Sequence, residues 1–131
     1  FFVRPTVFAD VDPQMAVARE EIFGPVLTVT PFDTEEEAVA LANGGDFDLA
    51  GAVWTRDIFR AQRMAKAIRA GTVWVNGYRA LSVMSPFGGM RGSGFGRSSG
   101  IDVMREYTQA KSLWIETDET ATPPFGYGPD D

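Results

Sequence analysis

Two adjacent glutamates beside an aromatic residue form the stretch of this sequence best suited to hold a ligand. Glu20 and Glu21 precede Phe23, and Gly24-Pro25 follows as a turn signal that changes the direction of the chain. A carboxylate fixed at such a turn has two oxygens that can accept hydrogen bonds from both hydroxyls of a sugar diol. Adjacent glutamates are more often plain surface charge, and residue statistics alone favour that alternative.

The chemistry open to the chain is limited, because its 131 residues include no cysteine and no histidine. Their absence excludes disulfides, thiolate nucleophiles, Cys/His metal sites and any Ser-His or Cys-His machinery within this sequence. Paired acids or a desolvated lysine are the remaining self-contained options, and Lys66 and Lys111 are the only lysines. We therefore predict no catalytic residue and no metal site, and the chain alone is a poor candidate for an enzyme.

A glycine-rich stretch is the second candidate ligand surface. Residues 71–76 read as a short buried strand, and six glycines from Gly88 to Gly100 follow Pro86. Such a loop lets the backbone approach another surface closely, and α/β proteins often place ligand contacts there; the alternative is a plain connector. The loop is not a P-loop, because no Gly-Lys-Ser/Thr ends it.

Composition bounds the remaining function classes. A chain of this length is the size of one domain, and 44% hydrophobic with 23% charged residues is ordinary for a globular protein. The net charge of −6 argues against nucleic-acid binding. No apolar run approaches the roughly 20 residues that span a bilayer, and the N-terminus lacks the pattern of a signal peptide. We expect a cytoplasmic protein, and the first residue, which is not methionine, suggests part of a longer chain.

The periodicity predicts strands that alternate with helices. We expect an edge strand in residues 1–8, one helical turn in 10–20, and strands over 26–32, 49–54 and 72–76. Asp33 with Glu36 fits a capping box for a helix that carries Ala38, Val39 and Ala42 inward and stops at Asn43-Gly44-Gly45. The next helix is capped by Thr55 or Asp57, has Ile58, Ala61, Ala65 and Ile68 at helical spacing, and ends with Gly71 as its C′ residue.

The predicted fold class is α/β, a β-α-β-α-β parallel sheet with flanking helices. Beyond the glycine-rich loop, Ser98 or Ser99 can cap a helix that runs to about Tyr107, and residues 111–116 follow as a final strand. The rest of the chain is acidic and rich in proline and glycine, and we expect residues 118–131 to be a disordered tail.

The strand–helix order invites a dinucleotide-binding interpretation, but the turns argue against it. The turns at residues 32–35 and 55–57 contain no glycine, which a pyrophosphate at a helix N-terminus requires. Arg60, Arg63 and Lys66 lie along one side of a helix and could form an anion site, although a solvated face is the commoner explanation.

Taken together, several segments resemble the C-terminal part of the aldehyde dehydrogenase superfamily. The resemblance runs from about Phe2 to Glu116. The matching motifs, in order, are Arg4-Pro5-Thr6-Val7-Phe8, Arg19-Glu20-Glu21-Ile22-Phe23-Gly24-Pro25-Val26, Gly71-Thr72-Val73-Trp74-Val75-Asn76, Ser85-Pro86-Phe87-Gly88-Gly89, Ser93-Gly94-Phe95-Gly96-Arg97 and Tyr107-Thr108-Gln109-Ala110-Lys111.

The resemblance implies a division of the chain and a cofactor. Residues 1–110 would be the second half of the catalytic domain, and residues 111–117 an oligomerisation strand. Glu21 matches the family glutamate that holds the nicotinamide ribose, and Phe23 the aromatic residue beside it. NAD or NADP would be bound mainly by an N-terminal Rossmann domain, which with the catalytic cysteine lies upstream of this region in the family.

The resemblance also implies a substrate surface and partners. Phe87 and Leu81 match walls of the aldehyde tunnel; an aliphatic residue at the position of Leu81, often aromatic in the family, would change its shape. Arg91 replaces a frequent lysine, which affects local contacts. The complete enzyme would convert an aldehyde and NAD(P)+ to an acid and NAD(P)H as a homo-oligomer, a dimer or tetramer, without nucleic acid or membrane. The alternative is a non-catalytic oligomerisation or scaffold module of the same fold.

Overall fold

The computed structural model describes residues 1–117, which contain two small parallel strand pairs. In the first, β1 (Thr6–Phe8) pairs with β2 (Val26–Thr28), with Thr6 opposite Val26, and the short helix α1 (Ala16–Arg19) lies in the connection. The helical turn expected in residues 10–20 is therefore confirmed. The N-terminal strand begins only after Pro5, which has no backbone N–H to donate to a partner strand.

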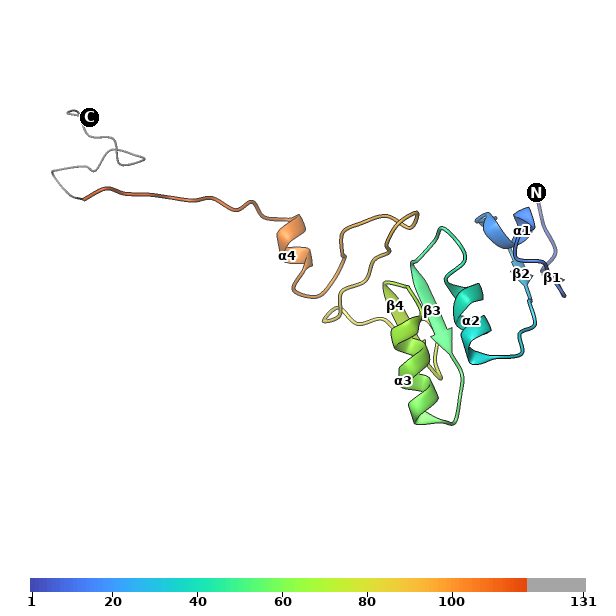
Figure 1. Cartoon of the computed structure of the whole chain (residues 1–131). Helices are drawn as coiled ribbons and strands as arrows, with labels where there is room; N and C mark the ends of the chain where they lie inside the picture. The colour runs from blue at the N-terminus through green and yellow to red at the C-terminus, as the bar shows by residue number, and fades with distance from the viewer. Residues whose placement is uncertain (118–131) are drawn as a thin grey trace, which may run out of the picture.

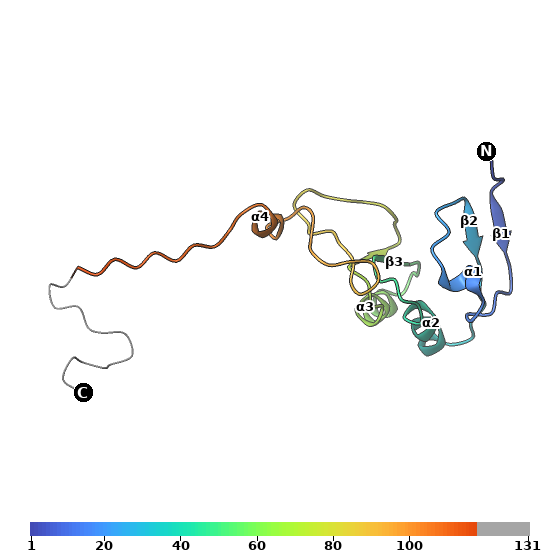
Figure 2. The ribbon, with the colours of Figure 1, turned by 90° about the horizontal axis from the view of Figure 1, so that it is seen from above.

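The second pair is the more extensive unit. β3 (Ala50–Val53) lies parallel to β4 (Thr72–Val75), and α3 (Ile58–Ala67) connects them and packs on both strands. The preceding helix, α2 (Glu35–Ala42), packs against α3. Figures 1 and 2 show the first pair at the N-terminal end of the body and the second pair at its centre.

Parallel pairing in an α/β fold is confirmed, but the strands form two sheets rather than one. β2 and β3 are not neighbours within residues 1–117. β2 stops at Thr28, short of the predicted residue 32, and Pro31 just beyond cannot donate to a ladder. Periodicity reveals strands, whereas the choice of neighbour is made by tertiary packing.

The helix caps correct one prediction and confirm another. The N-cap of α2 is Thr34, not Asp33: the Thr34 Oγ1 accepts the backbone N–H of Glu37 at 3.1 Å. The Glu37 carboxylate accepts the N–H of Asp33 at 2.8 Å, so Glu37 rather than Glu36 completes the reciprocal cap. For α3, Asp57 is the cap, and its Oδ1 accepts from Phe59 N at 2.9 Å.

Some of the inward positions predicted for the helices are wrong. Ala61 is buried, and Ala38, Val39, Ala65 and Ile68 are half-buried, but Ala42 and Ile58 are exposed. Helical spacing identifies a face, but a chain with few covering elements leaves part of that face open.

Three expectations about helix ends and the glycine-rich loop also change. α3 ends with Ile68 as its C-cap, so Gly71 is not C′ but leads into β4. The last helix, α4 (Val103–Glu106), begins after Asp102. The predicted cap at Ser98 or Ser99 is wrong, because the N-cap is Asp102, whose side chain makes no capping hydrogen bond. Ser98 instead exchanges two backbone hydrogen bonds of 2.8 Å with Phe87.

The predicted strand over residues 111–116 is not a strand in this structure. Residues 111–117 are extended, reach away from the body and form no β-ladder with another described strand (Figure 1). A strand needs the backbone groups of a neighbouring strand, and the described residues supply none here. The predicted tail, residues 118–131, lies outside the described residues.

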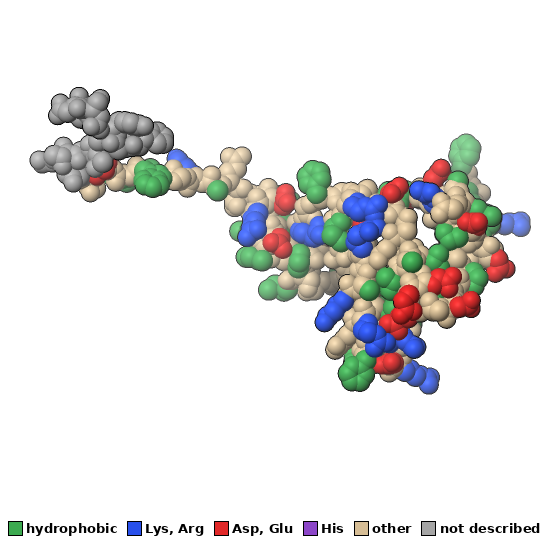
Figure 3. Space-filling model, in the orientation of Figure 1, with side chains coloured by type: hydrophobic (Ala, Val, Ile, Leu, Met, Phe, Trp, Pro, Cys, Tyr) green, Lys and Arg blue, Asp and Glu red, His purple; other side chains and the backbone are tan. Residues whose placement is uncertain are grey.

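The core of the described chain is small. Val11, Val53 and Ala61 are its buried hydrophobic side chains, and many large apolar residues are exposed (Figure 3). Apolar exposure on this scale is typical of a surface that contacts another polypeptide, a ligand or a membrane. Between residues 1 and 117, no helix has the length and apolar character needed to cross a membrane.

Candidate functional site

The turn between α1 and β2 brings Glu21 and Phe23 together. Both line one hollow of about 360 Å³ formed by residues from 17 to 28. The turn is tight: the Val26 N–H donates to the Gly24 carbonyl at 2.8 Å. Phe23 has φ 53°, and its side chain is 90% exposed. A bulky residue in this left-handed conformation is strained, and such strain clusters at functional sites.

The side chains at this turn have free binding capacity. Throughout residues 1–117, no group donates a hydrogen bond to the Glu21 carboxylate, and the ring of Phe23 has no aromatic partner. The neighbouring Glu20 also lines this hollow, and its backbone N–H donates to the Ala16 carbonyl at 2.8 Å at the end of α1. A carboxylate with two open acceptors beside an exposed ring can accept hydrogen bonds from both hydroxyls of a diol ligand.

The predicted tunnel residues lie on the loop that follows β4. Phe87 is half-buried and lines a second hollow, of about 420 Å³, together with Phe95 and Tyr107. Leu81 is 64% exposed and does not line this hollow. The Leu81 segment is fixed separately, because the Trp74 indole N–H donates to the Ala80 carbonyl at 2.8 Å. The structure therefore does not place Leu81 and Phe87 in one wall.

The two hollows are also separate from each other, since no residue lines both. The Glu21 hollow is built on α1, the turn that follows it and β2, and the Phe87 hollow on the glycine-rich loop and α4. Within the described range, no group of three or more acidic side chains is arranged to hold a metal ion.

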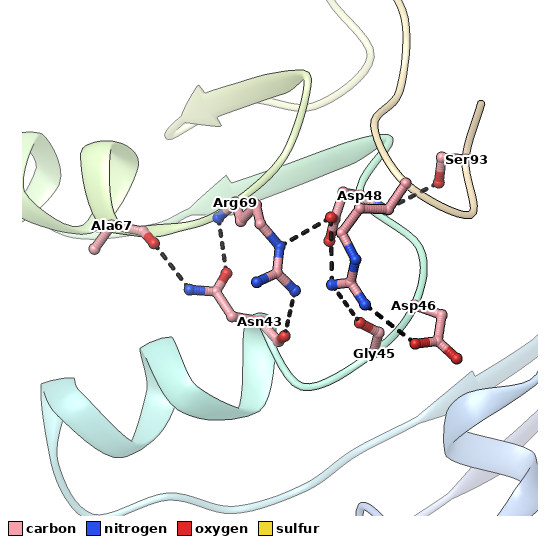
Figure 4. A network of polar contacts seen from close by, with 8 residues as sticks. Asn43, Gly45, Asp46, Asp48, Ala67, Arg69 and Ser93 are labelled. Atoms are coloured by element: carbon pink, nitrogen blue, oxygen red, sulfur yellow. Dashed lines mark hydrogen bonds and ion pairs between the residues drawn. The ribbon is translucent and has the colours of Figure 1, made fainter. Parts of the chain in front are cut away.

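A polar cluster around Asp48 was not predicted from the sequence (Figure 4). The Asp48 side chain is 1% exposed, and its Oδ2 accepts from Arg69 Nε at 2.9 Å and from Arg91 Nη1 at 3.5 Å. Its backbone N–H donates to Ser93 Oγ at 2.9 Å. The Oδ1 atom is buried and accepts no bond from the residues the structure describes. A buried carboxylate is costly unless paired, so the two guanidinium groups account for its position.

Asn43 extends this cluster to the ends of both helices. Its Nδ2 donates to the Ala67 carbonyl at 2.9 Å, and its Oδ1 accepts the Arg69 N–H at 2.7 Å. A sequence signal for the cluster does exist, because Asp48 and Arg69 each lie just ahead of a strand of the same parallel pair. Opposite charges at the same end of neighbouring parallel strands meet in space.

The basic face of α3 is not an open anion site. Arg60 and Arg63 both pair with Glu35 of α2, at 3.2 and 3.0 Å. The hydrogen bond from Arg63, followed by the charge of Arg63 and the contacts of Arg60, holds the pKa of Glu35 below its ordinary value. In return, the Glu35 carboxylate raises the pKa of Arg63. The face is solvated, as the commoner explanation has it, because the Arg60 and Arg63 side chains are 55% and 57% exposed. Both arginines also link α3 to α2 through Glu35.

Comparison with known proteins identifies relatives over nearly all of this region. The aldehyde dehydrogenase family model matches residues 1–113. A betaine aldehyde dehydrogenase of Cereibacter sphaeroides is 51% identical over 114 residues, which cover 87% of this chain and 24% of that protein. An NADP/NAD-dependent aldehyde dehydrogenase of Escherichia coli is 48% identical over 113 residues, covering 86% of this chain and 23% of that protein.

Solved structures give the same result for the fold. An aldehyde dehydrogenase of Mycobacterium tuberculosis, complexed with NAD+, superimposes with a TM-score of 0.83 at 48% identity. The match covers 92% of this chain and 25% of that one. The chain therefore spans about a quarter of the length of the curated relatives and solved structures that it matches.

Proposed function

Because the chain belongs to the aldehyde dehydrogenase family, we propose that it is the C-terminal part of an NAD(P)-dependent enzyme that oxidises an aldehyde to a carboxylic acid. The partial coverage of the relatives, the small core and the missing thiol all support this role. Residues 1–110 would complete the catalytic domain and residues 111–117 would serve in assembly. The chain alone would be inactive, because it has no nucleophile for the carbonyl.

The observation that carries the proposal is the shared hollow of Glu21 and Phe23. Glu21 would accept hydrogen bonds from the two hydroxyls of the nicotinamide ribose, and Phe23 would pack beside the ring system. NAD(P)+, when bound, supplies the acceptor for the hydride of the aldehyde. The two side chains would hold the ribose in place, and hydride transfer depends steeply on such positioning. A Rossmann domain elsewhere in the enzyme would bind most of the cofactor.

The substrate would be contacted from the loop after β4. Phe87, and Leu81 in the complete enzyme, would form part of the wall along which the aldehyde reaches the nucleophile. Leu81 offers an aliphatic side chain that is 64% exposed and open to contact with further parts of the protein. The identity of Leu81 would therefore affect which aldehydes fit.

The complete enzyme would be a homo-oligomer, a dimer or tetramer, in the cytoplasm, and the extended segment 111–117 supports the assembly into an oligomer. Leu113, Trp114 and Ile115 are all exposed there, and Trp114 is 91% exposed. An extended segment with bare apolar side chains gains backbone hydrogen bonds and burial when it adds to a sheet of a neighbouring subunit.

The proposal is tested by Glu21→Gln in the complete enzyme, with Glu20→Gln as the matched control. We expect Glu21→Gln to weaken NADH binding, measured by nucleotide fluorescence, and to lower kcat with the aldehyde. Loss of one charge-assisted hydrogen-bond acceptor corresponds to about a tenfold effect. Glu20→Gln is expected to leave both quantities close to the parent values, because the structural role of Glu20 is played by its backbone.

Equal effects of the two variants, or none, would remove the ribose assignment. Aldehyde oxidation by the purified chain of 131 residues would contradict the wider proposal. A complete protein that forms oligomers but binds neither NAD nor NADP would instead favour the non-catalytic scaffold.

A further inference from the structure

The Asp48 cluster ties the glycine-rich loop to the start of the β3–β4 pair. The loop is closed at its base by the two hydrogen bonds between Phe87 and Ser98, each 2.8 Å long. At its far end, Arg91 and Ser93 contact Asp48 through the ion pair at 3.5 Å and the hydrogen bond at 2.9 Å. The loop is thus closed on itself at its base, and its tip is held by the buried Asp48 together with Gly45 and Asp46, which accept further hydrogen bonds from Arg91 and Gly92.

The contacts of Asp48 come from two segments that lie far from it in sequence. Arg69 lies 21 residues away, ahead of β4, and Arg91 lies 43 residues away, in the loop. The backbone carbonyl of Asp48 accepts the Gly71 N–H at 3.0 Å. No other residue of the described chain is buried with a charge, so the cluster is centred on this carboxylate.

The carboxylate also separates two like charges. Both arginines donate to the same atom, Asp48 Oδ2, so their guanidinium groups face each other across it. Their side chains are only partly exposed, where repulsion between like charges is less screened than in water. Without the negative charge, Arg91 would be repelled by Arg69 and would draw the tip of the loop away.

We propose that Asp48 is a positioning residue, whose charge holds the glycine-rich loop, and with it Phe87, against the start of β3 and β4. The part that concerns the substrate rests on the proposed function. Asp48 does not touch the aldehyde; it acts through Arg91 and Ser93 on the loop whose base carries Phe87. The position of Phe87 in the wall of the aldehyde tunnel therefore depends on the charge of Asp48, which is not part of that wall.

The test compares Asp48→Asn with Asp46→Asn in the complete enzyme. Asp46 also pairs with Arg91, at 3.1 Å, but its side chain is 71% exposed, so its charge is screened by solvent. Asp48→Asn keeps the shape of the side chain and removes the charge. We expect the KM for the aldehyde to rise about tenfold, with NADH affinity unchanged, because a misplaced wall affects the substrate alone. Asp46→Asn is expected to shift KM by less than about twofold.

Hydrogen exchange supplies a readout that does not need activity. The Gly92 N–H, which donates to the Asp46 carbonyl at 3.0 Å, reports on the tip of the loop. We expect its exchange to accelerate in Asp48→Asn, while amides of α3 keep their parent rates. In the double variant Asp48→Asn with Arg91→Gln, which removes the repulsion but does not restore the ion pair, both KM and Gly92 exchange are expected to fall from the Asp48→Asn values to those of Arg91→Gln alone.

The outcomes test the positioning role of Asp48 and distinguish it from the proposed cofactor contacts of Glu21. Uniformly faster exchange throughout the protein, or a double variant that stays at the Asp48→Asn values, would overturn the positioning role. If Asp48→Asn does not fold, Arg91→Gln alone must still accelerate Gly92 exchange, or the role is wrong. Faster loop exchange in an enzyme where Glu21→Gln changes nothing would leave Asp48 positioning intact and remove the cofactor assignment.

Discussion

Gly71 and Gly88 pack backbone against backbone. A Cβ atom on Gly71 would overlap the carbonyl group of Gly88, although the two residues lie in different segments, one ahead of β4 and the other at the base of the glycine-rich loop. This contact explains why glycine stands at position 71: the requirement is space for another backbone, not a left-handed turn at the end of α3.

Gly71→Ala is therefore expected to destabilise the protein and loosen the loop. Forcing a methyl group into a filled contact costs about 1–3 kcal/mol, and here the obstacle is backbone, which yields less readily than a side chain. Thermal unfolding of the complete protein measures the loss. Gly45→Ala is the matched control, because its Cβ would meet its nearest neighbour at an ordinary 3.9 Å. Similar melting temperatures for the two variants would show that the close approach is not required.

The cap of α2 gives a second test. Thr34→Ala removes the Oγ1 that accepts the Glu37 N–H and is expected to cost about 1 kcal/mol. Asp33→Ala keeps the N–H that donates to Glu37 and is expected to cost much less. Chemical denaturation of both variants ranks them. The reverse order would restore Asp33 as the cap.

The Glu35 ion pair predicts a dependence on pH. Its pKa is lowered in the folded state, chiefly by the hydrogen bond from Arg63, so the unfolded chain binds the proton more readily than the folded one. The stabilising effect is present above the ordinary glutamate pKa and is lost as the pH falls through the lowered value. NMR titration of the Glu35 carboxyl carbon should show a midpoint below the ordinary glutamate pKa. Glu35→Gln should flatten the acid limb of stability, and a Glu35 midpoint at or above the ordinary glutamate value would contradict the pairing.

Asn43 provides a fourth prediction. Asn43→Ala breaks the bond to the Ala67 carbonyl and leaves the Arg69 N–H without its acceptor. We expect a loss of about 1–2 kcal/mol, measured by denaturant unfolding, because both groups link the end of α2 to the end of α3. Gln62→Ala, at an exposed position of α3, serves as the control and should change stability by less than about 0.5 kcal/mol. Equal losses would mean that the amide link is not important.

Local patterns predicted the features that depend on near neighbours. Asp57 as a helix cap needs only the residues that follow it, and the strand–helix order needs only periodicity. The shared hollow of Glu21 and Phe23 is likewise a property of one turn. The Thr34 cap was missed by one residue, because Asp33 and Thr34 are both good caps and the choice depends on the entry angle of the chain.

The sequence by itself determined the α/β class, the family and the turn that carries Glu21 and Phe23, because motifs and periodicity depend only on residues that are close together in sequence. Tertiary structure alone decided that the strands form two pairs and that Leu81 does not line the hollow of Phe87. It also decided that Asp48 gathers partners from 21 and 43 residues away. These contacts depend on which segments become neighbours in space, and no local preference records that choice.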